Sequence, residues 1–196
     1  MCAGKLPIIL HFTAWKNKMD WLKLAREIGF EDACILKAGD LIPKNEVREM
    51  CSADRCRAYG RNWTCPPARG TVEECTKRIK SCSSGILVQT VGKLEDSFDG
   101  EGITAAQKIH LSRFSAMVSR VQTLVKDCLP LAAGTCTRCE VCSYPDAPCR
   151  NPEGAFSSME AYGLLVSEVC RKSGMQYYKG ENTVSFVSCV LFREKQ

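Results

Sequence analysis

The chain has 196 residues, of which 45% are hydrophobic and 25% charged, and its net charge is +5. These values are typical of one ordinary globular domain, and the dispersed charge argues against a nucleic-acid-binding protein. No apolar run is long enough to span a membrane. The opening segment "MCAGKLPIILHFTAWKNK" lacks a small-residue cleavage site, so we expect no signal peptide and a cytoplasmic location. In that reducing compartment, fourteen cysteines indicate metal or redox chemistry rather than disulfides.

Helix and strand patterns alternate along the first half of the chain. The segment "MDWLKLAREIGF" has an apolar face and predicts a helix that ends at Gly29. "ACILKAG" predicts a short buried strand, and "NEVREMC" a helical turn leading into the first cysteines. Thr71 and Glu74 have the spacing of a capping box, which predicts a helix in "TVEECTKRIKSC". "GILVQTVG" predicts the next strand.

The middle of the chain contains the longest predicted helix. "KLEDSFDGEG" reads as a polar surface loop, and Thr104 and Gln107 repeat the capping-box spacing. They predict a helix that runs to about Lys126. "LPLAAG" then predicts a strand that leads into a second cysteine group. The predicted core-facing stripe of the helix is Ile109, Phe114, Met117, Val118, Val121, Leu124 and Val125.

The last third predicts one more helix and two strands. Ser157 and Glu160 form a third capping-box spacing, for a helix that ends at Gly174. "MQYYKGENTVSFVSCVLFRE" predicts two antiparallel strands joined at residues 180–182. We therefore expect one α/β domain over residues 1–196, with a mixed sheet of about five strands and both cysteine groups in loops at element ends. The strand order does not follow from the sequence.

The second cysteine group, "GTCTRCEVCSYPDAPCRNP", has the spacing C-x2-C-x2-C-x6-C. Bacterial ferredoxins use the same closely spaced triple with a shorter last spacer. Three thiolates in seven residues suit a 4Fe–4S cluster better than one zinc ion, although zinc remains the alternative. The helix predicted from about Ser158 would aim its positive N-terminus at the cluster. The predicted ligands are Cys136, Cys139, Cys142 and Cys149.

The first cysteine group, "CSADRCRAYGRNWTCPP", has the spacing C-x4-C-x8-C-P. Aromatic residues between its cysteines would shield a metal site from water, and the arginines would offset the negative charge of a cluster. A solvated loop whose tryptophan fills the core is the simpler alternative. The predicted ligands are Cys51, Cys56 and Cys65, and the predicted cofactor contacts are Arg57, Tyr59, Arg61 and Trp63.

Both cysteine groups, together with "SSMEAYG" after them, resemble a family of predicted metal-binding proteins of unknown function from anaerobic bacteria and archaea. The resemblance extends from about Trp21 to Phe192. It implies that all seven cysteines of the two groups are metal ligands. Seven further cysteines lie outside the motif: Cys2, Cys34, Cys75, Cys82, Cys128, Cys170 and Cys189.

These further cysteines and the two histidines have simpler interpretations. Cys34, Cys170 and Cys189 fit buried core positions. Cys75 and Cys82 lie seven residues apart on the helix predicted after the first group, and either is a candidate fourth ligand for that group. His11 and His110 are expected to be structural or exposed.

Three ligands in the first group leave several arrangements open. In the first arrangement, one iron of a cubane has no protein ligand. In the second, a fourth ligand comes from elsewhere in the chain or from a homodimer partner. In the third, both groups share one larger cluster. We expect an electron-transfer or reductase component with one or two 4Fe–4S clusters and a redox partner protein. The first alternative is an enzyme that binds a small substrate at an open iron, as desulfidases, dehydratases or sulfur-transfer enzymes do. The second is a zinc-stabilised interaction protein.

Overall fold

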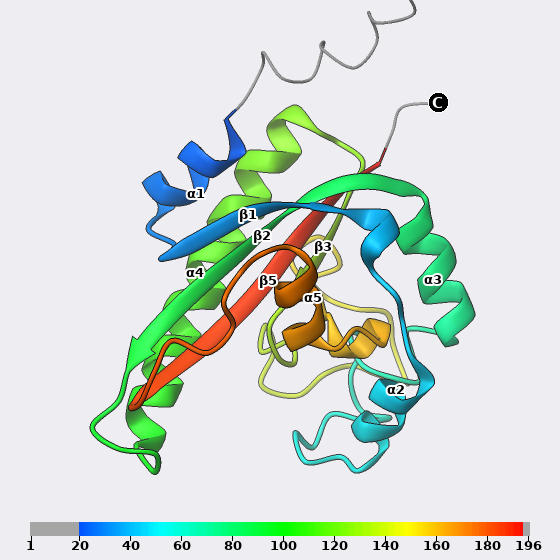
Figure 1. Ribbon diagram of the computed structural model, residues 1–196. Coiled ribbons are helices and arrows are strands. Elements are labelled where there is room, and N and C mark those ends of the chain that lie inside the picture. The colour runs from blue at the N-terminus through cyan, green and yellow to red at the C-terminus, as the bar shows by residue number, and fades with distance from the viewer. Residues whose placement is uncertain (1–19, 194–196) are drawn as a thin grey trace, which may run out of the picture.

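The computed structural model describes residues 20–193 (Figure 1). The opening segment considered above as a signal peptide, with Cys2 and His11, lies outside this range. The helices are α1 (Trp21–Ile28), α2 (Asn45–Ser52), α3 (Val72–Lys80), α4 (Gly100–Leu124) and α5 (Val166–Lys172), with short 3-10 turns η1 (Ala38–Asp40) and η2 (Glu160–Tyr162). The strands are β1 (Asp32–Lys37), β2 (Cys82–Lys93), β3 (Cys128–Ala132), β4 (Ser157–Ser158) and β5 (Thr183–Arg193).

The five strands form one mixed sheet in the order β1-β2-β5-β3-β4. All neighbours are antiparallel except β3 and β4, which pair in parallel. The longest pairing joins β2 to β5 and leaves both of them inside the sheet. The predicted single α/β domain with about five strands is confirmed.

Helices cover both faces of the sheet (Figure 1). Side chains of alternate β2 residues point to opposite faces of the sheet. Ile86 and Val88 pack with α1 and α4, and Leu87 packs with α3 and α5. In β5, Val190 and Leu191 divide in the same way. The sheet is therefore the middle of three layers, with a hydrophobic core on each side.

Local capping explains where the first helices begin and end. The Asp20 side chain accepts a hydrogen bond from the Lys23 N–H, and Gly29 ends α1 with a left-handed backbone, φ 102°. The predicted capping box of Thr71 and Glu74 is present at the start of α3. The predicted strand "ACILKAG" is present as β1, but β1 is an edge strand and only Leu36 in it is buried.

The start of the long helix differs from the prediction. Helix α4 begins at Gly100 because Asp99, not Thr104, is its N-cap: Asp99 Oδ1 accepts from the Gly102 N–H at 2.7 Å. The predicted apolar stripe is also partly wrong, because Ile109 and Leu124 are each 49% exposed. The buried stripe of the helix is Ala106, His110, Phe114, Met117, Val118 and Val121.

The predicted helix from Ser157 is the clearest error. Ser157 and Ser158 instead pair with Leu131 and Ala132 as strand β4, so no helix N-terminus faces the second cysteine group there. The helical part that ends before Gly174 begins only at Val166. Pairing with a distant strand outweighs a local capping signal in this segment.

Only one of the two strands predicted after α5 is present. Residues 175–182 do not join the sheet, whereas β5 does. The side-chain amide of Gln89 donates to the carbonyls of Gln176 and Tyr177, at 3.2 and 3.0 Å. Because β2 already pairs with a strand on each side, this segment has no free edge of β2 to join.

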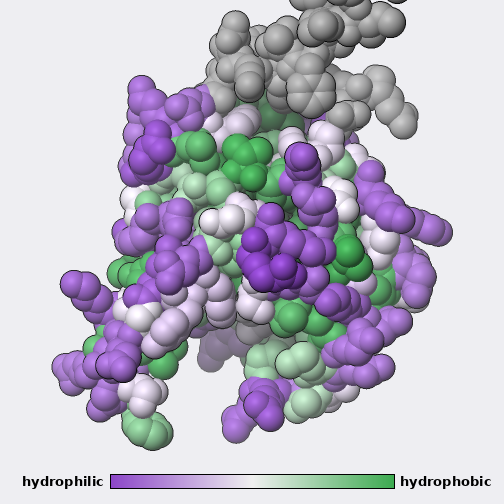
Figure 2. Space-filling view, viewed as in Figure 1, coloured by the Kyte–Doolittle hydropathy of each residue, from purple (hydrophilic) through white to green (hydrophobic). Residues whose placement is uncertain are grey.

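No helix within residues 20–193 has both the length and the apolar character needed to cross a membrane. On the face shown in Figure 2, hydrophilic side chains cover most of the surface and separate smaller hydrophobic patches. Exposed apolar groups of this kind are common on globular proteins.

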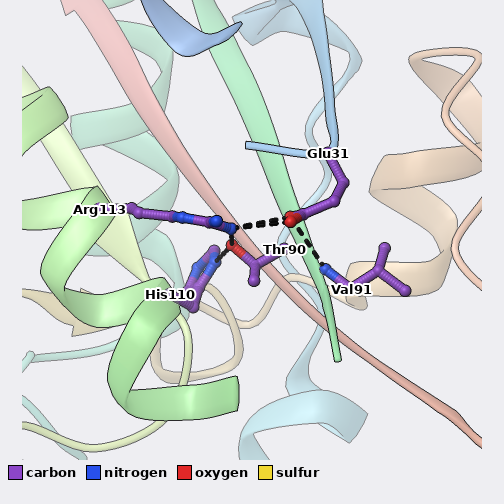
Figure 3. A network of polar contacts seen from close by, with 5 residues as sticks. All are labelled: Glu31, Thr90, Val91, His110 and Arg113. Atoms are coloured by element: carbon purple, nitrogen blue, oxygen red, sulfur yellow. Dashed lines mark hydrogen bonds and ion pairs between the residues drawn. The ribbon is translucent and has the colours of Figure 1, made fainter. Parts of the chain in front are cut away.

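A buried histidine joins α4 to the two central strands, and Figure 3 shows its contact with Thr90 of β2. His110 is fully buried, and its ring nitrogens bond to the hydroxyls of Thr90 on β2 and Ser188 on β5, at 2.9 and 2.7 Å. Beside it, Arg113 forms an ion pair with Glu31 at 2.9 Å. Burial, and next the Arg113 charge, lower the pKa of His110 to about 3. The structural interpretation of His110 is confirmed.

We expect His110 to make stability depend on pH. Its pKa falls from 6.5 to about 3 on folding, so the unfolded chain binds the extra proton and stability is lost as pH falls through that window. The loss amounts to about 5 kcal/mol at most. His110→Gln should lower stability at neutral pH but flatten this dependence, as measured by urea unfolding at about pH 7 and about pH 5. An equally steep dependence in the variant would contradict the assignment.

Candidate metal centre

The two cysteine groups lie against each other, on the side of the molecule that carries α2 and α5 (Figure 1). Three contacts join the loop after α2 to the loop between β3 and β4. The Asn62 side-chain amide donates to the Cys136 carbonyl at 3.3 Å, and the Trp63 indole N–H donates to the Ala147 carbonyl at 3.0 Å. The thiol of Cys65 and the hydroxyl of Thr135 are 3.4 Å apart. We call these contacts the loop seam.

All four cysteines of the second group line one small pocket. The same pocket is lined from the first loop by Asn62, Trp63 and Thr64. Trp63 also packs edge-on against Tyr144, with ring centroids 4.8 Å apart. The predicted shielding residue of the first group therefore covers the second group. The four thiols are Cys136, Cys139, Cys142 and Cys149.

The second loop is folded tightly by its own hydrogen bonds. The Ser143 hydroxyl donates to the Pro148 carbonyl at 2.8 Å, and the Ala147 N–H donates to the Ser143 carbonyl at 2.9 Å. These bonds close the six-residue spacer so that Cys149 returns to the pocket. The Asn151 amide then donates to the Cys139 sulfur at 3.3 Å, a contact that stabilises negative charge on that sulfur.

The first loop is organised around Asp54. Its backbone is left-handed, φ 52°, and its carboxylate accepts from the Tyr59 N–H and forms an ion pair with Arg61. Arg57 is left-handed as well, φ 54°. Non-glycine residues rarely adopt this conformation, and such strain is often found at functional sites. Cys51 lies in the last turn of α2, just before this bend.

Of the four predicted cofactor contacts in the first loop, only one lies beside a group of thiols. Arg61 is paired with Asp54, so its charge is already balanced. Arg57 and Tyr59 are exposed, and within residues 20–193 neither side chain forms a hydrogen bond or ion pair with a cysteine. Trp63 alone of the four contributes to a thiol pocket, and that pocket belongs to the second group.

Sequence reasoning missed Arg48, the cation that lies beside the first group. Its guanidinium donates to the Gly70 and Ala161 carbonyls at 2.8 and 3.0 Å and lies 3.7 Å from the Cys75 sulfur. Its charge also opposes the rise in the pKa of Cys51. Arg48 and Cys51 are three residues apart on α2, hence on one helix face, and this spacing was the available signal.

Burial disfavours bare thiolates at three positions across both loops. It raises the pKa of Cys51, Cys65 and Cys136 above the ordinary value. Neighbouring sulfurs raise the pKa of Cys65 further, and these belong to both groups, namely Cys56 and Cys142. Cys65 thus lies within electrostatic reach of both groups. A bound cation would favour the thiolate forms, because metal ligands must be deprotonated.

The other described cysteines occupy the sheet and its cores. Cys170 and Cys189 are fully buried as predicted, and Cys34 is half-buried on β1. Cys82 is the first residue of β2 and does not share a helix with Cys75, contrary to the prediction. The thiols of Cys75 and Cys82 donate to the carbonyls of Arg69 and Arg78, both at 3.6 Å.

Within the described range, no three His, Cys, Asp or Glu side chains converge closely enough to hold a single metal ion. Four sulfurs around one zinc ion would lie about 3.8 Å apart, given a Zn–S bond of about 2.3 Å. The thiols here line a pocket instead of forming such a closed tetrahedral set. Thiolates around a multi-iron cluster bind different irons and stand farther apart.

No curated protein and no solved structure matches the chain. A family model described as "Predicted metal-binding protein (DUF2284)" matches residues 34–192. This span contains the whole sheet after Ala33 except Arg193, and all seven cysteines of the two loops. The chain therefore belongs to the DUF2284 family of predicted metal-binding proteins, as the resemblance in its cysteine motifs implied.

Proposed function

We propose that the two cysteine loops bind iron–sulfur clusters and that the protein is an electron-transfer protein or the electron-transfer component of a reductase. The observation that carries this proposal is the pocket of the second group, which is lined by four thiols and covered by Trp63. Four thiolates are the usual ligand set of a 4Fe–4S cluster. The Asn151 contact adds an N–H···S bond of the kind that tunes such clusters.

The donor atoms of both loops fit this cofactor. The second group supplies a full set of four thiols, and the loop seam brings Cys65 of the first group within electrostatic reach of Cys142. Two neighbouring clusters, or one larger cluster over seven thiols, are both compatible with this proximity. When bound, an iron–sulfur cluster accepts and releases single electrons at a potential that its surroundings set.

The protein's own residues would set that potential. Burial raises the pKa of Cys136, and the Arg138 backbone N–H and guanidinium charge oppose that rise and so favour the thiolate. Arg48 has a similar influence on Cys51. Positive charge and N–H donors stabilise the reduced, more negative form and so raise the potential. Electrons would pass to a partner protein or a small-molecule acceptor, in the cytoplasm if the expectation from cysteine usage holds.

A second candidate function rests on the first group. It contributes only three thiols, and Cys56 is exposed. A cubane held by Cys51, Cys56 and Cys65 would keep one iron for an oxygen or sulfur atom of a small substrate, as in a desulfidase, dehydratase or sulfur-transfer enzyme. Ligation by Cys142 would instead close that position. A zinc-stabilised interaction protein remains the non-redox alternative.

Metal analysis after anaerobic purification tests the cofactor. We expect about eight irons and equal acid-labile sulfide per chain if both groups hold four-iron clusters, and about four if one does. Cys139→Ala and Cys51→Ala should each remove the iron of their own group, or all of it if one cluster is shared. Cys34→Ala, at the far edge of the sheet, is the matched control and should retain all iron.

Two outcomes would contradict this proposal. Stoichiometric zinc without sulfide would favour the structural alternative. Full iron content in both Cys139→Ala and Cys51→Ala would show that neither cysteine group binds the iron. If iron is present, addition of small thiols or hydroxy acids while EPR spectra are recorded separates the two iron proposals, because only an open iron responds to them.

Asn151 should raise the reduction potential of the cluster bound by the second group. Its amide donates to the Cys139 sulfur, and this bond is stronger in the more negative reduced state. Loss of a bond worth about 1 kcal/mol net corresponds to roughly 40 mV for one electron. Asn151→Ala should therefore lower the potential measured by film voltammetry by roughly 20–60 mV.

Two further variants make this measurement decisive. Asn151→Asp keeps the size of the side chain but replaces the donor with a negative charge, so it should lower the potential more than Asn151→Ala. Asn45→Ala, exposed at the start of α2, should leave the potential unchanged. A potential unaffected by either Asn151 variant would show that this bond does not act on a redox centre.

A further inference from the structure

A second, larger pocket of about 300 Å³ lies next to the second cysteine group, between that loop and α4. One face of α4 forms its wall, with Lys108, Leu111, Ser112 and Ser115 spaced as neighbours on one helix surface. The opposite wall comes from the loop after β3 and includes Cys136. The remaining lining residues are Phe114, Ala132, Thr135, Thr137, Arg138, Gly154 and Phe156.

The charges that line this pocket have one sign. Among the residues that the structure describes, Lys108 and Arg138 line it, whereas no Asp or Glu does. Within residues 20–193, Lys108 has no ion-pair partner. Arg138 is held by two hydrogen bonds, from Nε to the Gly154 carbonyl at 3.1 Å and from Nη2 to the Ser115 hydroxyl at 2.6 Å. Neither bond neutralises its charge, so the pocket favours an anion.

Hydroxyl groups and an aromatic base complete the pocket. Four hydroxyls, from Ser112, Ser115, Thr135 and Thr137, line it and can donate to oxygen atoms of a ligand. The apolar part is formed by the partly buried Leu111 and Phe156, and Phe156 packs edge-to-face on the fully buried Phe114 with ring centroids 5.7 Å apart. A volume of this size is at the lower end of small-molecule sites, which combine apolar walls with a few polar groups.

We propose that this pocket binds a small organic carboxylate whose apolar body lies on Leu111 and Phe156 and whose carboxylate is held by Lys108 and Arg138. A guanidinium and an ammonium, with hydroxyl donors near them, are suited to the two oxygens of a carboxylate. Cys136 lines both this pocket and the thiol pocket, so the ligand would bind directly beside the second cysteine group.

This site differs from the one that the sequence indicated. The sequence indicated Arg57, Tyr59 and Arg61 of the first loop as cofactor contacts, but Arg61 is paired with Asp54. The cations of the new pocket come from α4 and the second loop. The inference concerns ligand binding alone and holds whichever metal the thiols bind.

Benzoate is the probe that tests it, because it combines one carboxylate with an apolar ring. We expect the full-length, anaerobically purified protein to bind benzoate in isothermal titration calorimetry, and to bind neutral benzyl alcohol at least about tenfold more weakly. Lys108→Gln should weaken benzoate binding by about tenfold, the loss expected for one charged hydrogen bond. Ser112→Phe should abolish it by filling the pocket.

Lys80→Gln is the matched control, since Lys80 is exposed on α3, which packs against the other face of the sheet. It should leave benzoate binding unchanged. No benzoate binding at millimolar concentration, equal weakening in Lys80→Gln, or tighter binding of inorganic phosphate than of benzoate would each overturn the proposal.

Iron content, measured on the same samples, separates this inference from the proposed function. Lys108→Gln should keep its full metal content, so failure to bind benzoate with full metal content counts only against the carboxylate site. Cys139 lines the thiol pocket but not the larger one, so Cys139→Ala changes only the thiol pocket. Loss of iron in that variant with benzoate binding retained would support both proposals independently.

Discussion

The candidate metal centre depends on the loop seam, the three contacts that join the two cysteine loops. Trp63 donates a hydrogen bond to the second loop and packs on Tyr144. Asn62 and Cys65 form the other two contacts with that loop. Each such hydrogen bond contributes about 1 kcal/mol net, so together they hold the loops by a few kcal/mol. Without them the four-thiol pocket would lose its cover, and the thiols of the two groups would no longer influence one another. A metal bound across the seam would add to this coupling, because binding at a site that folding creates stabilises the fold.

The sheet positions this seam through elements that are far apart in the sequence. The first loop leaves α2, which packs near η2, and the second loop connects β3 to β4 at one edge of the sheet. Strands β2 and β5 form the rigid centre, and His110 ties α4 to both of them. Helix α4 then presents its second face to the loop after β3, where the larger pocket lies. Sites carried by loops on a rigid scaffold are common in proteins, because loops can vary while the scaffold keeps their ends in place.

Charge distribution connects the thiol pocket with the carboxylate pocket. The seven thiols of the two groups would become negative on binding a metal, and burial opposes that change unless positive charge is near. Arg48 meets this need at Cys51, and Arg138 meets it at Cys136. Arg138 also lines the larger pocket, so one guanidinium would influence both the proposed metal ligand Cys136 and the proposed carboxylate. A ligand bound there would therefore change the electrostatic surroundings of the second group.

The sequence by itself determined those features whose signals act within a few residues. The end of α1 at Gly29, the capping box of α3 and the two cysteine spacings could all be read directly, because each depends on hydrogen bonds or ligands close together in the chain. Where two local signals competed, the tertiary structure decided: Asp99 rather than Thr104 begins α4, and Ser157 pairs with Leu131 instead of capping a helix. The loop seam, the position of Arg48 beside Cys51 and Cys75, and the shared wall at Cys136 also required the structure. They join segments up to 113 residues apart, and no local preference of the chain specifies which distant segments will meet.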